Sequence, residues 1–137
     1  MLWVKTMYKV FTYGSLKKDF WNNNYLRDSK LIHVTAISCD KYVLQNEGIP
    51  YAIPKDYAPY EQARRIIGEI WEVDEYTLHN LDCLEGHPSW YNRQLREFTV
   101  FSDTKVEAWI YEYPKLIIDT IKVANVVGEC YEWQGRY

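Results

Sequence analysis

The 137-residue chain has no long apolar run, no cluster of basic residues and only three cysteines. No segment approaches the roughly eighteen consecutive apolar residues that a membrane-spanning helix needs. The first residues carry scattered charge and lack the compact apolar block of a secretory signal peptide. Cys39, Cys83 and Cys130 are widely spaced and odd in number, which argues against a disulfide framework. We therefore expect a cytoplasmic protein that does not use a membrane as partner.

Lysine and arginine occur at most as adjacent pairs, and the formal net charge is −3. Such a chain offers the phosphates of nucleic acid little to bind, so we expect no nucleic-acid partner. The length suits one domain with its own core. Because no repeat, linker or low-complexity tract interrupts the sequence, residues 1–137 are interpreted as a single domain. The oligomeric state is left open.

Aromatic residues are abundant, with 13 tyrosines and six tryptophans. Such residues favour half-buried strands, although a tyrosine also suits a pocket because its far end forms hydrogen bonds. We expect a short helix starting near Asp19, irregular chain over 49–60 and a tail of undecided structure. Gly68 predicts a bulge or a close backbone approach. Strand patterns cover 8–14, 31–44 (one strand or two), 64–74, 90–101 and 105–114.

The segment DEYTLHNLDCLEG changes to a helical period, because leucines recur at intervals of three. Asp74 is placed as the N-cap, and Gly86 follows the last turn as a residue that ends helices. The predicted fold class is α+β: a single domain with a mixed, mostly antiparallel β-barrel and a few short helices.

Glu85 ends this helix, where the macrodipole disfavours a negative charge. The dipole and any burial would raise the pKa of Glu85 towards neutrality, where a carboxyl group serves as general base and then as general acid. The alternative is an exposed glutamate at a frayed helix end, at a cost of about 0.5 kcal/mol. Taken without any relative, the residues favour this alternative.

The first predicted strand enters the turn Tyr13-Gly14-Ser15-Leu16. A glycine there lets successive backbone N–H groups point in one direction and bind a carboxylate or an oxyanion. An ordinary strand-ending turn explains the same residues.

Three further groups of residues give weaker evidence of function. His79, Cys83 and His87 are spaced by four, but His87 lies beyond the helix and no fourth zinc ligand is evident. Cys83 also lacks a group that would orient a neighbouring histidine, so a thiol nucleophile is not supported. Tyr111 and Tyr113 share one strand face, which either lines a pocket or packs in the core.

The strand followed by YGSL, together with the later stretch GEIWEVDEYTLHNLDCLEGHPSWYNR, resembles the γ-glutamylcyclotransferase family, which includes γ-glutamylamine cyclotransferases and AIG2-like proteins. The resemblance spans roughly residues 8–113. It rests on the order and separation of the motifs: GE-aromatic-x-V before the helix, LDxLEG at its end and aromatic-Tyr-x-Arg after it.

The resemblance implies a cyclotransferase of the lyase or acyltransferase type that uses no metal and no organic cofactor. Such enzymes act on a small-molecule γ-glutamyl substrate. Its own α-amine attacks its γ-carbonyl, and 5-oxoproline and a free amine are released. The matching positions are the acid/base Glu85 and, for substrate binding, Tyr13, Gly14, Ser15, Leu16, Tyr91 and Tyr111.

Departures from the family pattern leave the amine unspecified. Phe20 and Trp21 are bulkier than the residues that relatives often carry. The paths of the loops 17–24 and 54–60 cannot be predicted from the sequence. The tail after Pro114 does not align with the family pattern. Two other classes of function stay open: a binding module that holds a small glutamyl-like or other anionic ligand without turnover, and an interaction protein with a filled barrel.

Overall fold

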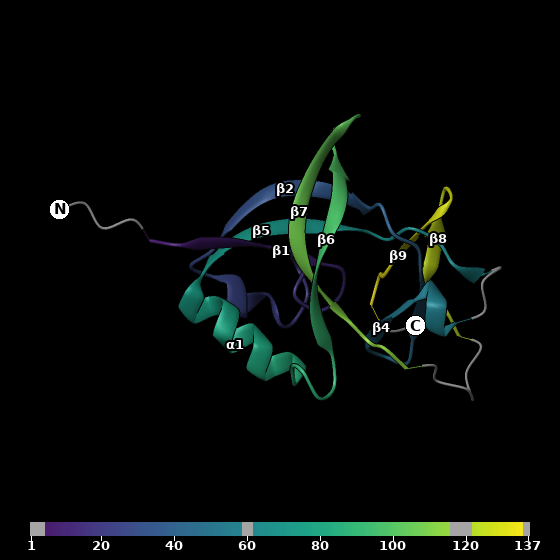
Figure 1. Ribbon diagram of the computed structural model, residues 1–137, viewed down its shortest axis with the longest axis horizontal. Helices are drawn as coiled ribbons and strands as arrows, with labels where there is room; N and C mark the ends of the chain where they lie inside the picture. Colours follow the sequence, from purple (N-terminus) through teal and green to yellow (C-terminus); the bar gives the residue numbers. More distant parts are fainter. Residues whose placement is uncertain (1–4, 59–61, 116–121, 136–137) are drawn as a thin grey trace.

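The fold is built on a closed five-stranded barrel, seen in a computed structural model that describes residues 5–58, 62–115 and 122–135. The strand order is β1-β5-β2-β6-β7, and all neighbours are antiparallel except β1 and β7. The predicted mixed, mostly antiparallel barrel is therefore confirmed. Its strands are β1 (Met7–Thr12), β2 (Lys30–Ser38), β5 (Ile67–Asp74), β6 (Asn92–Val100) and β7 (Thr104–Glu112) (Figure 1).

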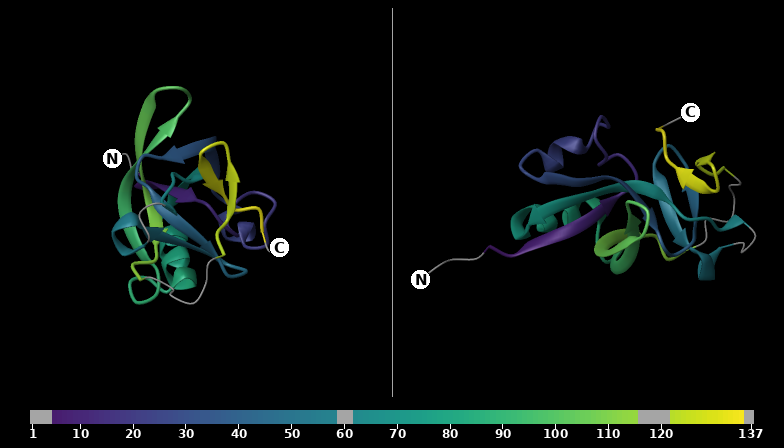
Figure 2. Two further views of the ribbon diagram at one scale, coloured as in Figure 1. Left: turned by 90° about the vertical axis from the view of Figure 1, so that its right-hand side faces the viewer. Right: turned by 90° about the horizontal axis from the view of Figure 1, so that it is seen from above.

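Two small sheets lie together at one end of the barrel (Figures 1 and 2). One pairs β3 (Tyr42–Asn46) with β4 (Pro50–Pro54), and the other pairs β8 (Asn125–Val127) with β9 (Cys130–Glu132). The pattern over 31–44 thus forms two strands. The irregular chain expected over 49–60 was wrong for β4, whose prolines stand at its two ends in a sheet with only edge strands, where proline is tolerated.

The connection after β1 differs from the expected helix near Asp19. Asp19 has a left-handed backbone with φ of 75°, which a right-handed helix cannot continue. The segment instead ends in the short 3-10 helix η1 (Asn23–Leu26). A second 3-10 helix, η2 (Lys55–Tyr57), follows β4.

Helix α1 (Glu75–Glu85) has the predicted caps. The side chain of Asp74 accepts a hydrogen bond from the Thr77 N–H at 2.7 Å. Gly86 adopts the left-handed conformation with φ of 66°, which places it after the last helical turn. In the described residues, no helix is long and apolar enough to cross a membrane.

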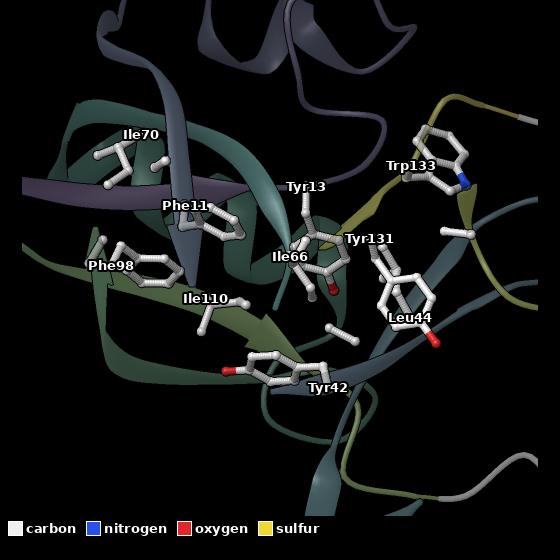
Figure 3. Packing of buried hydrophobic residues seen from close by; sticks show 14 of the residues in the cluster. Phe11, Tyr13, Tyr42, Leu44, Ile66, Ile70, Phe98, Ile110, Tyr131 and Trp133 are labelled. Atoms are coloured by element: carbon white, nitrogen blue, oxygen red, sulfur yellow. The ribbon is translucent and has the colours of Figure 1, made fainter. Parts of the chain in front are cut away.

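The barrel interior is packed with aromatic rings. The rings of Phe11 and Phe98 stack with their centroids 4.2 Å apart, and Tyr13 follows Phe11 at 6.3 Å (Figure 3). Gly68 makes this packing possible, because a Cβ there would lie 2.3 Å from the Thr12 carbonyl oxygen and 2.6 Å from the Phe11 ring. The close approach predicted at Gly68 is confirmed.

The tail that did not align contributes to the core. Trp133 is fully buried, and its indole N–H donates a hydrogen bond to Asn46 Oδ1 at 3.1 Å. Phe20 and Trp21 contact its ring at centroid distances of 5.1 and 5.5 Å. The bulk of these two residues therefore serves to dock the tail.

Candidate active site

A cavity of about 180 Å³ opens between the turn after β1, the end of α1 and the start of β4. All seven residues that the sequence proposed for the site line this cavity, although they come from separate parts of the chain. The lining residues are Phe11, Thr12, Tyr13, Gly14, Ser15, Leu16, Asn22, Ile49, Pro50, Leu84, Glu85, Trp90, Tyr91 and Tyr111.

Glu85 lines the cavity at the end of α1, and the chain folds back directly after it. The N–H of Trp90 donates to the Gly86 carbonyl oxygen at 2.8 Å, and the N–H of Tyr91 donates to that of Glu85 at 3.2 Å. This turn places Tyr91 beside Glu85 in the cavity wall. The Glu85 side chain is partly buried, and the loss of solvent raises its pKa to about 7. The exposed glutamate of the alternative interpretation is not present.

The turn after β1 forms the opposite wall. The Lys17 N–H closes it onto the Gly14 carbonyl oxygen at 3.0 Å. Asn22 donates two hydrogen bonds to Ser15. Its backbone N–H donates to the Ser15 carbonyl oxygen at 3.0 Å, and its side-chain Nδ2 donates to Ser15 Oγ at 2.8 Å. Within the described residues, the N–H groups of Gly14, Ser15 and Leu16 donate to no other protein group. These N–H groups are free to bind a carboxylate or an oxyanion.

Gly14 is needed for space. A Cβ at this position would lie 2.6 Å from Pro50 Cγ, so only glycine lets the turn approach β4 this closely. The sequence predicted that glycine is needed here for its backbone conformation. The structure shows that glycine is needed because Pro50 lies too close for a Cβ.

Three tyrosines line the cavity, and each donates its hydroxyl hydrogen bond to a protein acceptor. Tyr13 donates to the Tyr111 carbonyl oxygen at 2.6 Å, and Tyr91 donates to the Pro50 carbonyl oxygen at 2.7 Å. Tyr111 donates to Asp82 Oδ1 at 2.7 Å. Burial is the main cause that raises the pKa of each hydroxyl, and the hydrogen bond to Asp82 adds to it at Tyr111, so all three are neutral at physiological pH.

Comparison with known proteins agrees with this geometry. The family model described as "Gamma-glutamyl cyclotransferase, AIG2-like" matches residues 10–134. The chain belongs to this family. A Methanocaldococcus jannaschii relative, provisionally named a gamma-glutamylcyclotransferase, is 43% identical over 107 residues, which are 77% of this chain and 84% of the relative. Gamma-glutamylaminecyclotransferase B of Danio rerio is 34% identical over 77% of this chain and 59% of its own length.

The solved structures of the cyclotransferase family show the same fold. The crystal structure of an AIG2-like protein of Mus musculus superposes with a TM-score of 0.72 at 25% sequence identity, over 92% of this chain and 88% of the mouse chain. The fold and the family are thus established by independent comparisons.

The structure of this cyclotransferase-family chain adds residues that sequence reasoning missed. Asp82, one turn before Glu85 on α1, accepts hydrogen bonds from Arg93 Nε and Nη2 at 2.8 and 3.1 Å as well as from Tyr111. The Arg93 guanidinium lies 4.3 Å from the centroid of the Trp109 ring. The available signal was the acidic residue three positions before Glu85 in LDxLEG.

The two loops for which the sequence predicted no path differ in their relation to the cavity. Of the loops 17–24 and 54–60, the first reaches the cavity through Asn22, and the described part of the second (54–58) does not line it. Ile49 and Pro50, where β4 begins, also line the cavity. Trp90 stands at the mouth, with 47% of its surface exposed. Within the described residues, no group of three or more His, Cys, Asp or Glu side chains is placed to hold a metal ion.

Proposed function

We propose that the chain is a γ-glutamyl amine cyclotransferase that releases 5-oxoproline and a free amine. The observation that carries the proposal is Glu85, with a pKa raised to about 7, in one cavity with the free N–H groups of the turn after β1. Membership of the cyclotransferase family supports the reaction class.

Binding positions the two reacting ends of the substrate. The backbone N–H groups of Gly14, Ser15 and Leu16 hold the α-carboxylate or the developing oxyanion. A cavity of about 180 Å³ holds a glutamyl chain in a folded conformer. Because the attack is intramolecular, fixing this conformer supplies much of the rate acceleration.

Glu85 then transfers the protons. Its carboxylate removes a proton from the α-ammonium, and the free amine attacks the γ-carbonyl carbon to form the ring C–N bond. The protonated Glu85 delivers this proton to the amide nitrogen, and the old C–N bond breaks to release the amine. The ring nitrogen still carries one proton too many, which it gives to the Glu85 carboxylate. Glu85 passes this second proton to the departing amine, so 5-oxoproline, an ammonium product and the ionised Glu85 result. A pKa near 7 suits both steps, since the group gains and loses a proton at small cost. The sequence of steps requires no nucleophilic side chain.

The mouth of the cavity bears on the leaving group. Among the described residues that line the cavity, Glu85 is the one charged side chain, and Trp90 and Ile49 are apolar. None of these described residues is a cation that could pair with a second carboxylate. These features support an amine without a carboxylate as the leaving group.

The test is a turnover assay. The protein is incubated with γ-glutamyl amines and γ-glutamyl amino acids, and 5-oxoproline is quantified. With the wild-type protein we expect 5-oxoproline from the amines, and with Glu85→Gln we expect its formation to slow by about 10²–10⁴-fold. The absence of product with every substrate, or full activity in Glu85→Gln, would overturn the proposal. Thermal stabilisation by these ligands without product would instead support the binding module.

A further inference from the structure

The carbonyl groups of the turn after β1 are held by the chain that follows the turn. The Gly14 carbonyl oxygen accepts from the Lys17 N–H at 3.0 Å, and the Ser15 carbonyl oxygen accepts from the Asn22 N–H at 3.0 Å. In a planar trans peptide, the C=O of one residue and the N–H of the next point in opposite directions. These two bonds therefore set the directions of the Ser15 and Leu16 N–H groups, which point away from the donors that hold the carbonyls.

The side chain of Lys17 connects this turn to the far end of the described chain. Its ammonium donates a buried hydrogen bond to the Trp133 carbonyl oxygen at 2.7 Å, across 116 positions of sequence. Neither Lys17 nor any described residue of the tail 122–135 lines the cavity. The bond thus joins the turn to a segment that lies outside the cavity wall.

Trp133 is a well-fixed anchor for this bond. It is fully buried, and its indole N–H donates to Asn46 Oδ1 at 3.1 Å. The Phe20 ring packs on the Trp133 ring at a centroid distance of 5.1 Å, and the Lys17 Nζ lies 5.2 Å from the centroid of the Phe20 ring. The Phe20 N–H also donates to the Lys17 carbonyl oxygen at 3.1 Å. Lys17, Phe20 and Trp133 therefore form one packed unit next to the turn.

Lys17 is buried although it is charged, with only 9% of the residue exposed. Burial lowers the pKa of its ammonium, and the negative charges of Glu132 and Glu69 oppose this shift. A buried charge costs free energy that an apolar side chain at the same place would not. Packing against Phe20 and Trp133 thus does not explain why this residue is a lysine, whereas a hydrogen bond to a fixed carbonyl group does.

We propose that Lys17 is a positioning residue for substrate binding. Its ammonium fastens the turn after β1 to the C-terminal segment at Trp133, and this keeps the N–H groups of Ser15 and Leu16 in the direction that a carboxylate needs. The inference rests on the proposed function for the identity of the ligand, the α-carboxylate of a γ-glutamyl group. It goes further by making the C-terminal segment a support of the substrate turn.

The first measurement compares two ligands that differ by a carboxylate alone. 5-Oxoproline carries it, and 2-pyrrolidinone has the same lactam ring without it. Lys17→Met keeps a long unbranched side chain and removes the ammonium. In titration calorimetry, this variant is expected to bind 5-oxoproline about five- to tenfold more weakly than the wild type and 2-pyrrolidinone less than about twofold more weakly. An unchanged affinity for 5-oxoproline, or equal weakening of both ligands, would overturn the proposal.

The second measurement reads the turn itself and needs no ligand. The Asn22 amide, which is bonded to the Ser15 carbonyl oxygen, is expected to exchange its hydrogen at least about fivefold faster in Lys17→Met, relative to the amides of β5, when followed by NMR. Lys17→Arg restores a charged donor and should recover most of the amide protection and of the 5-oxoproline affinity. No change in Asn22 exchange in Lys17→Met would contradict the positioning role.

A matched control separates positioning from loss of stability. Val100 is a buried residue of β6 that does not line the cavity. Val100→Ala should lower the melting temperature through the space it leaves in the core. It should change the affinity for 5-oxoproline less than about twofold and speed exchange at Asn22 and in β5 alike. The same selective losses in Val100→Ala as in Lys17→Met would mean a merely structural role for Lys17.

The outcomes also separate this inference from the proposed function. If the wild-type protein forms no 5-oxoproline from any γ-glutamyl substrate, the proposed function fails, and amide exchange still tests the link between Lys17 and the turn. If turnover is normal and Lys17→Met behaves as the wild type, the positioning role alone fails. If Lys17→Met does not fold, Lys17→Gln takes its place under the same expectations.

Discussion

The Tyr13 hydroxyl donates a hydrogen bond to the Tyr111 carbonyl oxygen, 2.6 Å away and 98 positions later in the chain. This bond ties the turn after β1 to the end of β7, so the two walls of the cavity are held at a fixed separation. The bond is buried, where a hydrogen bond left unmade would cost about 1–3 kcal/mol. The site is therefore preorganised by the barrel itself.

The first prediction concerns the pH dependence of catalysis. Because Glu85 must be ionised to accept a proton and its pKa is raised to about 7, kcat/KM is expected to rise with pH and level off above about 7. Glu85→Gln should lower kcat by about 10²–10⁴-fold. The control is Glu75→Gln, an exposed residue at the other end of α1, and loss of activity in this control would contradict the assignment.

The same shift predicts a change in stability with pH. Between the unfolded pKa of 4.5 and the folded pKa of about 7, the folded protein keeps a proton on Glu85 that the unfolded chain loses. The stability that this proton contributes is complete below 4.5 and is lost as the pH rises through about 7. The free energy of unfolding of Glu85→Gln should therefore exceed that of the wild type by about 1–3 kcal/mol at pH 8, and the two should differ little at pH 4.5. Urea titrations at both pH values measure this, and a constant difference would contradict it.

Gly14→Ala should distort the substrate turn. The new Cβ would lie 2.6 Å from Pro50 Cγ, and relieving that clash costs about 1–3 kcal/mol. We expect a lower melting temperature and weaker binding of carboxylate ligands. Adding Pro50→Ala removes the clashing atom and should restore most of the stability. Failure of the double variant to recover would show that the strain lies elsewhere.

Trp133→Ala tests the role of the tail. This side chain is fully buried against Phe20 and Trp21, and its loss is expected to lower the free energy of unfolding by about 3–5 kcal/mol in a denaturant titration. Trp21→Ala is the control, because half of Trp21 is already exposed (50%) and the loss should be about 1 kcal/mol. Similar losses in both variants would contradict a core role for the tail.

Trp90→Ala tests the mouth of the cavity. Trp90 is 47% exposed where the leaving amine would emerge. Removing its ring should raise KM about three- to tenfold for a γ-glutamyl arylalkylamine, because an aromatic contact contributes about 1 kcal/mol, and should leave a γ-glutamyl methylamine nearly unchanged. Equal effects on both substrates would place the leaving group elsewhere.

Local signals explain which elements were predictable. The cap Asp74, the left-handed Gly86 and the leucine spacing specify α1 within a short window, so its bounds could be predicted. The strands β6 and β7, on either side of the tight turn at 101–103, are also specified by residues close together in the sequence. β4 was missed because its prolines signal irregular chain, and its strand geometry comes from pairing with β3.

The sequence by itself determined the fold class, the seven candidate site residues and the placement of Glu85 at a helix end, since these depend on neighbouring residues and on motif order. Only the tertiary structure decided that Glu85 is desolvated, that Gly14 must clear Pro50, and that Asp82 holds Tyr111. Each of these depends on the separation of atoms that are distant along the chain, and barrel closure sets that separation. The charge at the end of α1 is a local feature, whereas its raised pKa is a product of the barrel packed around it.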